Sequence, residues 1–266
     1  MPRRTWSKVL PPEAAEREAA GLRWLAAAQG SGGAAVVTVV ALEGPRLVLE
    51  RLTRAHPQPL HAREFGRALA RTHAAGALTW GMAPPGTRGD GVIGAARLAT
   101  PTHPEAPDAP RHWGEFYATY RLLPHLRNAV GRDSVSPQGA RAVEEVCALL
   151  VDGAMNHPQP QLLEPDTPAR VHGDLWSGNV MWTETGCVLI DPAAHGGHAE
   201  TDLAMLALFG LPYLQDVLAG YQEVSPLAPG WQDRVHLHQL HPLLVHAELF
   251  GGWYGDQAVA AARACT

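Results

Sequence analysis

The spacing of apolar and polar positions changes near residue 53. Before that point, alternating apolar residues predict three short strands, at residues 4–10, 34–42 and 46–52. Between the first two strands, residues 13–29 have the spacing of an amphipathic helix, with Pro12 at its start and Gly30 beyond its end. We therefore expect a small β-rich N-terminal lobe over residues 1–52.

The remaining residues, 53–266, are predicted to form a larger helical lobe. Apolar residues recur at helical spacing in six segments, at residues 60–75, 113–130, 137–152, 202–209, 214–222 and 231–250. A glycine- and proline-rich stretch at residues 76–112 predicts a long surface loop, and residues 179–183 and 187–190 predict a hairpin. An α+β chain with a β-rich first lobe, a connector near residues 50–59 and a helical second lobe is typical of protein kinase-like folds.

The most informative motif is His172-Gly-Asp174-Leu-Trp176-Ser-Gly-Asn179, which is followed by an apolar run ending at Asp191. Phosphoryl transfer needs an aligned acceptor hydroxyl and neutralised phosphate charge, with little covalent chemistry from the protein. Asp174 is the candidate base, and Asn179 and Asp191 are candidate Mg²⁺ ligands that would hold the metal against the phosphates of ATP. Each piece alone is compatible with an ordinary turn or strand end, but the combination favours a small-molecule kinase.

Two charged residues of the N-terminal lobe fit the same interpretation. Lys8 is the only lysine and lies on the first predicted strand, whereas Glu18 lies on the apolar stripe of the helix that follows. A carboxylate on a core-facing stripe requires a cation, so we expect Lys8 to pair with Glu18 and to hold the nucleotide phosphates. A solvated lysine near a frayed terminus is the alternative. Glu50 and Leu52 fall in the predicted connector, where backbone groups could bind adenine.

Other motifs resemble binding sites without the context that such sites need. Gly89-Asp-Gly-Val-Ile-Gly94 has the glycine spacing of a nucleotide-binding loop, but no helix follows, so we expect a substrate-side loop or a plain turn. His195-Gly-Gly-His198 and His236-x-His238-x-x-His241 have metal-like spacing, but we expect structural histidines because no carboxylate or cysteine completes a set. Glu200 and Asp202 flank a helix start, where a structural role is also favoured.

Composition narrows the possible partners. A formal net charge of -5 over 266 residues gives no reason to expect nucleic acid as a partner. The three cysteines (Cys147, Cys187 and Cys265) share no metal or redox spacing, which favours reduced thiols in a cytoplasmic protein. No apolar run approaches the roughly 20 residues that a membrane helix needs, and the basic N-terminus lacks the apolar stretch of a signal peptide. We expect a small-molecule substrate, and the oligomeric state is left open.

The same motifs resemble those of the fructosamine-3-kinase (ketosamine kinase) family, which is related to the aminoglycoside phosphotransferases. The resemblance covers nearly the whole chain. Its most specific pieces are residues 172–179, Asp191-Pro-Ala193 and Gly197-His-Ala-Glu-Thr-Asp-Leu-Ala-Met205, and it continues to Gln239-Leu-His-Pro-Leu-Leu-Val-His246. Residues 90–94, Trp113 and Arg121-Leu-Leu-Pro124 are also similar to the family's segment before its central helices. Trp176, after Asp-Leu, separates this family from aminoglycoside and choline kinases.

The resemblance implies ATP- and Mg²⁺-dependent phosphorylation of the 3-hydroxyl of a ketosamine, either a small molecule or protein-bound. In the family the phosphorylated product breaks down and frees the amine, which repairs glycated proteins. By position, Asp174 would be the base, Asn179 and Asp191 the metal ligands, and Lys8 with Glu18 the pair that anchors the phosphates.

On the substrate side, the resemblance points to Trp176, Asp90 and His172. Trp176 would form a wall for the sugar or the amine, although packing alone could explain an indole there. Bacterial members often favour ribulosamines or erythrulosamines, so the natural sugar is left open.

One departure from the family concerns the nucleotide loop. Family members carry two strands and a glycine-rich loop ahead of the lysine strand, whereas seven residues precede Lys8 here. We expect either a start assigned too late or a lobe that lacks this cover over the phosphates, which would admit water. Without this loop the chain could be a catalytically impaired, pseudokinase-like binding protein. A second alternative is a kinase of another small alcohol or aminoglycoside, because the same apparatus accepts many hydroxyls.

Overall fold

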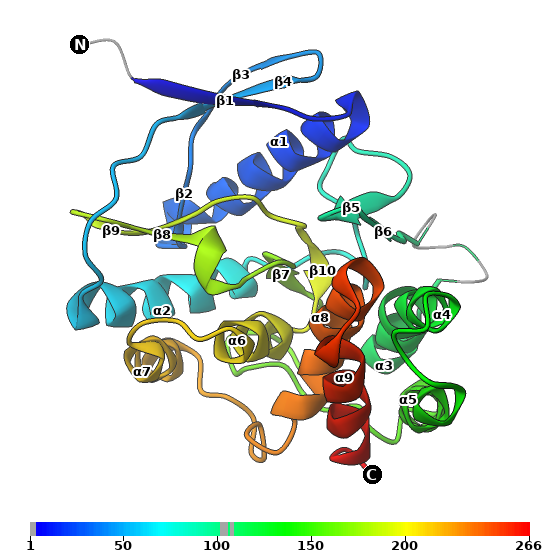
Figure 1. Cartoon of the computed structure of the whole chain (residues 1–266). Helices are drawn as coiled ribbons and strands as arrows, with labels where there is room; N and C mark the ends of the chain where they lie inside the picture. Colours follow the sequence, from blue (N-terminus) through cyan, green and yellow to red (C-terminus); the bar gives the residue numbers. More distant parts are fainter. Residues whose placement is uncertain (1–3, 102–105, 107–108) are drawn as a thin grey trace.

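The computed structural model describes residues 4–101, 106 and 109–266. A small antiparallel sheet with one helix lies above a larger, mainly helical region that contains the C-terminus (Figure 1). The sheet has the order β1-β4-β3 and consists of β1 (Thr5–Val9), β3 (Val39–Glu43) and β4 (Arg46–Glu50). Lys8 pairs with Leu47 in this sheet, so the only lysine of the chain lies on an ordered strand.

The predicted strand at residues 34–42 is wrong as a single element. Its first part is β2 (Ala35–Val36), which pairs in parallel with β9 (Gly186–Leu189), and only its second part, β3, joins the N-terminal sheet. The antiparallel partner of β9 is β8 (Val180–Thr183), which confirms the predicted hairpin. Because β2 pairs with a strand more than 140 residues away, no local pattern could reveal its separation from β3.

The helix after β1 is α1 (Pro12–Ala26), which continues as the 3₁₀ turn η1 (Ala27–Ser31). Proline at its first position fits a helix start, because the amide that proline lacks would have no helical partner there. Ala15, Ala19, Leu22 and Leu25 form its buried stripe and pack toward the sheet and the region below it.

The predicted loop at residues 76–112 contains a short hairpin, β5 (Gly91–Ile93) and β6 (Ala96–Leu98). Residues 102–105 and 107–108 of this predicted loop lie outside the described residues. The sequence Gly89–Gly94 therefore enters a hairpin whose turn includes Gly94 at φ +57°, and it does not lead into a helix. A further two-stranded sheet, which was not predicted, pairs β7 (Ala169–Val171) with β10 (His195–Gly197).

The predicted helices of the second lobe are confirmed with shifted ends. They are α2 (Pro59–Ala74), α3 (Trp113–Phe116), the π-helical turn η2 (Tyr117–Leu122), α4 (Leu123–Gly131), α5 (Pro137–Val151), α6 (Ala199–Leu208), α7 (Leu214–Val224) and α8 (Val235–Phe250). Ser136 Oγ accepts a hydrogen bond from the Gly139 amide at 3.0 Å, so the predicted cap of α5 is present. The alanine-rich helix α9 (Trp253–Arg263) was not predicted.

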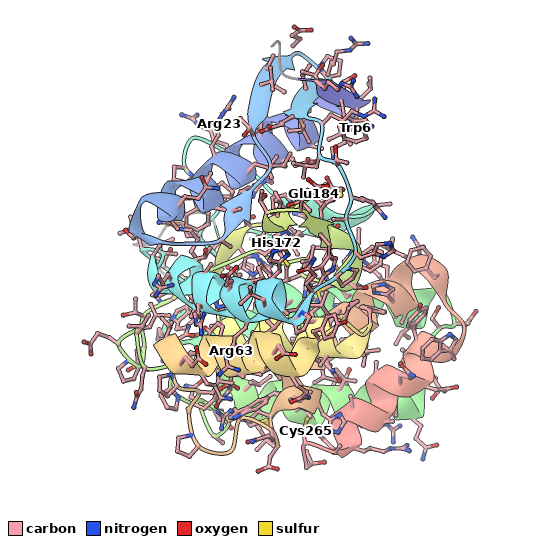
Figure 2. The ribbon with its side chains drawn as sticks, turned by 90° about the vertical axis from the view of Figure 1, so that its left-hand side faces the viewer. Trp6, Arg23, Arg63, His172, Glu184 and Cys265 are labelled. Atoms are coloured by element: carbon pink, nitrogen blue, oxygen red, sulfur yellow. The ribbon has the colours of Figure 1, made fainter. Side chains whose placement is uncertain are left out.

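Helices α2 and α7 cross at unusually close range because each presents a glycine. A Cβ atom at Gly66 would lie 1.9 Å from the Val217 carbonyl oxygen, and one at Gly220 would lie 2.0 Å from the Arg63 carbonyl oxygen. On the surface above this contact, Glu223 pairs with both Arg63 and Arg67, and Figure 2 shows Arg63 beside these two helices. The backbone contact and the ion pairs fix the position of α2. This helix carries His73, whose ring contacts Asp202.

The larger hydrophobic cluster joins residues of α1 and β4 to residues of α2, α7, β8 and β9. A second cluster fills the space between α4, α5, α8 and α9. Because the first cluster extends across both regions, the N-terminal sheet is packed onto the segment that carries the candidate site. Among the described residues, no helix has both the length and the apolar character to cross a membrane.

Candidate active site

Lys8 links the two regions of the chain. Its Nζ atom lies 2.7 Å from Glu18 Oε2 on α1 and 2.7 Å from Asp191 Oδ1, which comes shortly after β9. Burial lowers the pKa of Lys8, but the two carboxylates outweigh it, so the pKa is raised overall. Lys8 is therefore firmly charged, and the predicted contact with Glu18 is present.

For Glu18, burial has a larger effect on the pKa than its charged partner has. Burial raises its pKa more than Lys8 lowers it, and the nearby Asp191 charge raises it further. Its Oε1 atom is buried without a hydrogen-bond partner. The pair is thus a lysine shared between two carboxylates, one of them partly desolvated.

The loop that carries Asp174 is held from below by Asp202. Asp202 Oδ2 accepts hydrogen bonds from the His172 amide (2.7 Å) and from the His73 ring (3.1 Å), and its Oδ1 accepts one from the Gly173 amide (3.0 Å). Burial raises the pKa of Asp202, but these partners outweigh it and hold the pKa below its ordinary value. The predicted structural role of Asp202 therefore takes the form of an ionised anchor beneath the loop.

Gly173 leaves no room for a side chain in this loop. Its φ is +81°, and a Cβ atom would lie 2.2 Å from the Ala193 carbonyl oxygen. Both the left-handed backbone and the close approach to the segment after β9 require glycine here. The loop and the Asp191 segment are consequently held against each other.

Asp174 and Asn179 face each other across this loop. Asn179 Nδ2 donates to the Asp174 carbonyl oxygen at 2.7 Å and to Asp174 Oδ2 at 3.0 Å, and the Asn179 carbonyl accepts from the Ile190 amide at 3.1 Å. Burial raises the pKa of Asp174 to about 6, with smaller contributions from Asp202 and Asp191. A carboxylate with a pKa close to neutrality is suited to accept a proton at physiological pH.

Asp191 has a backbone conformation that is uncommon for a residue other than glycine. Its φ is +52°, which lies in the left-handed region, and its side chain is 43% exposed. Such outliers persist where the surroundings hold them, and they are often found at functional sites. Here the conformation directs one carboxylate oxygen to Lys8, close to Asn179 and Asp174.

All five of these side chains line one cavity of about 310 Å³: Lys8, Glu18, Asp174, Asn179 and Asp191. Trp176 also lines it, with its side chain 40% exposed. The Trp176 ring lies over Gly178, where a Cβ atom would be 2.3 Å from the indole. This space, which charged and polar side chains of the predicted site line, is the charged cavity.

A second cavity, of about 340 Å³, lies on the other side of Asp191, which lines both. Its wall includes Glu50 and Leu52, with apolar contributions from Val37 and Ile190. The connector residues singled out in the sequence thus lie next to the charged cavity and line a second one, whose wall combines apolar side chains with charged ones.

The other two residues predicted for the substrate side do not line the charged cavity. Asp90 lines a neighbouring hollow, forms an ion pair with Arg97 and accepts a hydrogen bond from the Thr100 amide. His172 is 1% exposed, and its Nε2 atom lies 2.9 Å from the Ile190 carbonyl oxygen. Figure 2 shows His172 in the interior, between the N-terminal region and the helices below. Its side chain therefore supports the loop from inside, through its hydrogen bond to Ile190, the residue after β9.

The expectation that no carboxylate completes a histidine set is wrong. His157, His198, Glu200 and His238 have potential ligand atoms within 4.8 Å of one another. Glu200 is already paired through both oxygens with Arg234, at 2.7 and 3.0 Å. The Nε2 atoms of His157 and His238 lie 2.9 Å apart. These partners are those of a buried hydrogen-bond network, which agrees with the structural role expected for His198 and His238.

Two cations in the charged cavity were missed in the sequence, Arg17 on α1 and Arg121 on η2. A signal existed for Arg121, which follows Trp113 and Tyr117 at intervals of four residues. It therefore lies on an apolar stripe, the same criterion that drew attention to Glu18.

Comparison with known proteins agrees with this geometry. A family model described as fructosamine kinase matches residues 11–265. A relative from Synechocystis sp., named a probable ketoamine kinase, is 39% identical over 202 residues, which is 76% of this chain and 61% of that protein. The chain thus matches about three fifths of the length of this relative.

Solved structures give the same result for the fold. A crystal structure from Thermobifida fusca, whose name assigns it to the fructosamine-3-kinases, is 43% identical and has a TM-score of 0.84, with 99% of this chain and 85% of that chain covered. A macrolide 2′-phosphotransferase from Brachybacterium faecium, 17% identical, shares the fold with a TM-score of 0.56, with 97% of this chain and 83% of that chain covered. The fold is protein kinase-like, as predicted, and the chain belongs to the fructosamine kinase family.

Proposed function

We propose that this protein is a ketosamine 3-kinase, which transfers the γ-phosphoryl group of ATP to the 3-hydroxyl of a ketosamine. The observation that carries the proposal is the convergence of Lys8, Glu18, Asp174, Asn179 and Asp191 on one cavity in a chain of the fructosamine kinase family. The N-terminal lobe, residues 1–52, would anchor the nucleotide, and residues 53–266 would supply the catalytic loop and the acceptor site.

The nucleotide would lie between the two cavities. Glu50 and Leu52 line the second of them, where connector backbone groups would bind adenine. Asp191 borders both cavities, and Lys8 lies beside it, so the phosphates would extend from one cavity into the other along these two residues. Lys8 would then exchange part of its contact with Asp191 for a phosphate oxygen.

The donor set fits Mg²⁺, which prefers oxygen ligands. Asn179 uses its Nδ2 atom as a donor to Asp174, which leaves Oδ1 as its metal-binding atom, and Asp191 has a second carboxylate oxygen beyond the one that contacts Lys8. When bound, the ion would neutralise charge on the phosphates. Asn179 and Asp191 would hold it, and the backbone contacts of both residues fix their positions.

Asp174 would orient the acceptor hydroxyl and take its proton. Its raised pKa, about 6, leaves it mostly ionised at neutral pH and still basic enough to accept a proton late in the transfer. Trp176 would form a wall for the sugar or the amine, because its ring is partly exposed in the same cavity. Phosphorylation at the 3-position would lead to breakdown of the adduct and release of the amine, a repair of glycated molecules.

The test is incubation of the purified chain with Mg-ATP and fructoselysine or ribuloselysine, with ADP and phosphorylated sugar measured together. We expect formation of both products by the wild type and none by Asp174→Asn. ADP formation with aminoglycosides or choline but not with ketosamines would instead support a kinase of another alcohol. Ligand binding without any turnover would support the impaired, pseudokinase-like alternative.

A further inference from the structure

The charged cavity has a basic side that phosphoryl transfer by Lys8, Asp174, Asn179 and Asp191 leaves unexplained. Arg17 and Arg121 both line it. Within the described part of the chain, neither forms a salt bridge with a carboxylate, and the nearby Asp90 is paired with Arg97. Two guanidinium groups therefore face a substrate-sized space without a directly paired carboxylate among the described residues, and Asp90 acts on them only at longer range.

Arg121 is the more constrained of the two. It is 1% exposed, its Nη1 donates to the carbonyl oxygens of Ala99 (2.8 Å) and Tyr120 (3.0 Å), and its guanidinium lies 4.6 Å from the centre of the Phe116 ring. Its Nε atom is buried without a partner. A buried cation without a direct ion pair is costly to the folded protein, so its place beside a cavity calls for an anion.

Arg17 adds a second charge to the same side. Its Nη2 donates to the Gly89 carbonyl oxygen, and its stem lies against the backbone of β5, where a Cβ atom at Gly91 would be 3.0 Å from Arg17 Cδ. Burial lowers the pKa of Arg121 to about 9, and the Arg17 charge contributes to this lowering. His195, which lines the same cavity, has its pKa lowered to about 3 by burial and then by the Arg121 charge. Arg121 and His195 thus both lie in a field of positive charge from the neighbouring arginines, which an anion would relieve.

We propose that Arg17 and Arg121 form a subsite for an anionic group of the acceptor, either a carboxylate on its amine part or a phosphate on its sugar. This inference rests on the proposed ketosamine 3-kinase function and narrows its substrate class to acidic ketosamines. Guanidinium groups suit both anions because their N–H donors match carboxylate and phosphate oxygens. The acceptor is the expected carrier because Asp174 and Trp176 line the same cavity.

The first test needs no mutation. The kcat/KM of the wild type is measured for the fructose adduct of glycine, for the fructose adduct of glycinamide, and for the latter with a phosphate on the 6-position of the sugar, all at saturating Mg-ATP. The first two substrates differ by one charge and little in shape. We expect the carboxylate or the phosphate to raise kcat/KM by about ten- to a hundredfold over the neutral amide, the effect of one charge-assisted hydrogen bond.

The outcomes separate the two proposals. A preference for the acid identifies the amine part as the source of the anion, and a preference for the phosphate identifies the sugar. Equal turnover of all three substrates would overturn the anion subsite and leave the kinase assignment intact. Turnover of none of them, and of no ribulose counterpart, would overturn both.

Variants of Arg17 and Arg121 then test whether these two residues cause the preference for an anionic substrate. Arg121→Gln and Arg17→Gln should each lower the ratio of kcat/KM between the anionic and the neutral substrate by about tenfold, and Arg121→Lys should restore part of it. Arg23→Gln is the matched control, because Arg23 is exposed on the same helix as Arg17, does not line the charged cavity and should leave the ratio unchanged. If Arg121→Gln does not fold, the kcat/KM ratio of Arg17→Gln alone tests the proposal. A raised KM for ATP with an unchanged substrate ratio would show that the arginines bind the nucleotide and would overturn the proposal.

Discussion

Lys8 Nζ lies 2.7 Å from Asp191 Oδ1, although 183 positions separate the two residues in the sequence. The contact joins the N-terminal sheet to the segment after β9, and Glu18 shares the same ammonium from α1. One cation therefore holds together three parts of the chain at the border of both cavities. Its removal would leave two neighbouring carboxylates, one of them partly buried, without compensation.

Replacement of Lys8 by methionine should lower kcat/KM for ATP by about a hundredfold or more, because the phosphates lose their cation and the two carboxylates repel each other. Lys8→Arg keeps the charge and should retain more activity than Lys8→Met. Circular dichroism at neutral pH checks that both variants fold. An unchanged KM and kcat in Lys8→Met would contradict a role of this residue in nucleotide binding.

Because Lys8 is the only lysine, its environment can be probed chemically. We expect slow acylation by amine-reactive reagents, since the side chain is 19% exposed and its pKa is raised overall by the two carboxylates despite burial. Mg-ATP should slow the reaction further. Peptide mass spectrometry separates Lys8 from the terminal amine, which provides an internal control. Equal labelling with and without Mg-ATP would argue that the nucleotide does not cover Lys8.

Asp174→Asn should lower kcat by roughly a thousandfold with a smaller effect on KM, because the amide cannot accept the proton of the acceptor. In the wild type, kcat/KM should fall as the pH drops through about 6, where Asp174 becomes protonated. Return of acid-treated samples to pH 7.5 should restore activity. Asp166→Asn, at an exposed position in a turn, serves as the control and should leave both constants unchanged.

Gly173→Ala should destabilise the protein by about 3 kcal/mol and reduce activity, because the new Cβ atom combines a left-handed backbone with a clash against Ala193. Gly44→Ala provides the comparison: Gly44 also has positive φ, at +58°, but a Cβ atom there would meet nothing within 4 Å. That variant should lose about 1 kcal/mol and keep its activity. Urea unfolding of both proteins measures the difference, and equal losses would mean that the Ala193 contact is unimportant.

Acid should destabilise the protein through its buried histidines. Burial lowers the pKa of His157, His195 and His238 to about 3 in the folded chain, whereas an unfolded histidine has a pKa of about 6.5. Below pH 6.5 the unfolded chain therefore binds protons that the folded chain does not, and the free energy of unfolding falls as the pH drops toward 3. Each group contributes on the order of 1 kcal/mol per pH unit.

Two variants on α8 test this explanation. His238→Gln should reduce the slope of unfolding free energy against pH between 6.5 and 4.5, because it removes one buried imidazole. His236→Gln, at an exposed position two residues away, should leave the slope unchanged. Unfolding free energies from urea titrations at several pH values provide the measurement. Parallel curves for the wild type and His238→Gln would rule out the proposed contribution of His238.

Elements with a long local pattern could be predicted from the sequence, whereas elements defined by contacts between distant parts of the chain could not. Helices such as α2 and α5 repeat their apolar positions over four turns, so their existence could be read from the chain alone. Strands of two or three residues, such as β2 and β7, carry too little pattern and are defined by partners far away. The hairpin of β5 and β6 is local, but its strands of three residues lie in a glycine- and proline-rich stretch and also carry too little pattern.

The candidate site shows the same division. Asp174 and Asn179 lie within one short motif, and Glu18 was conspicuous as a charge on an apolar stripe, so all three could be singled out. The gathering of His157 with Glu200 and His238 depends on three separate elements and could not be foreseen. Arg121 fulfilled the criterion that identified Glu18, and its burial beside the cavity could have been anticipated from its spacing.

The proposed ketosamine 3-kinase activity is tested most directly by the position of the phosphate on the product. After incubation with Mg-ATP and a ketosamine that has all its hydroxyls free, ³¹P and ¹³C NMR of the product should show one phosphate ester coupled to C3, formed in equal amount with ADP. Asp174→Asn should give neither product. ADP release without a sugar phosphate, or a phosphate ester at another carbon, would contradict the assignment of this protein as a ketosamine 3-kinase.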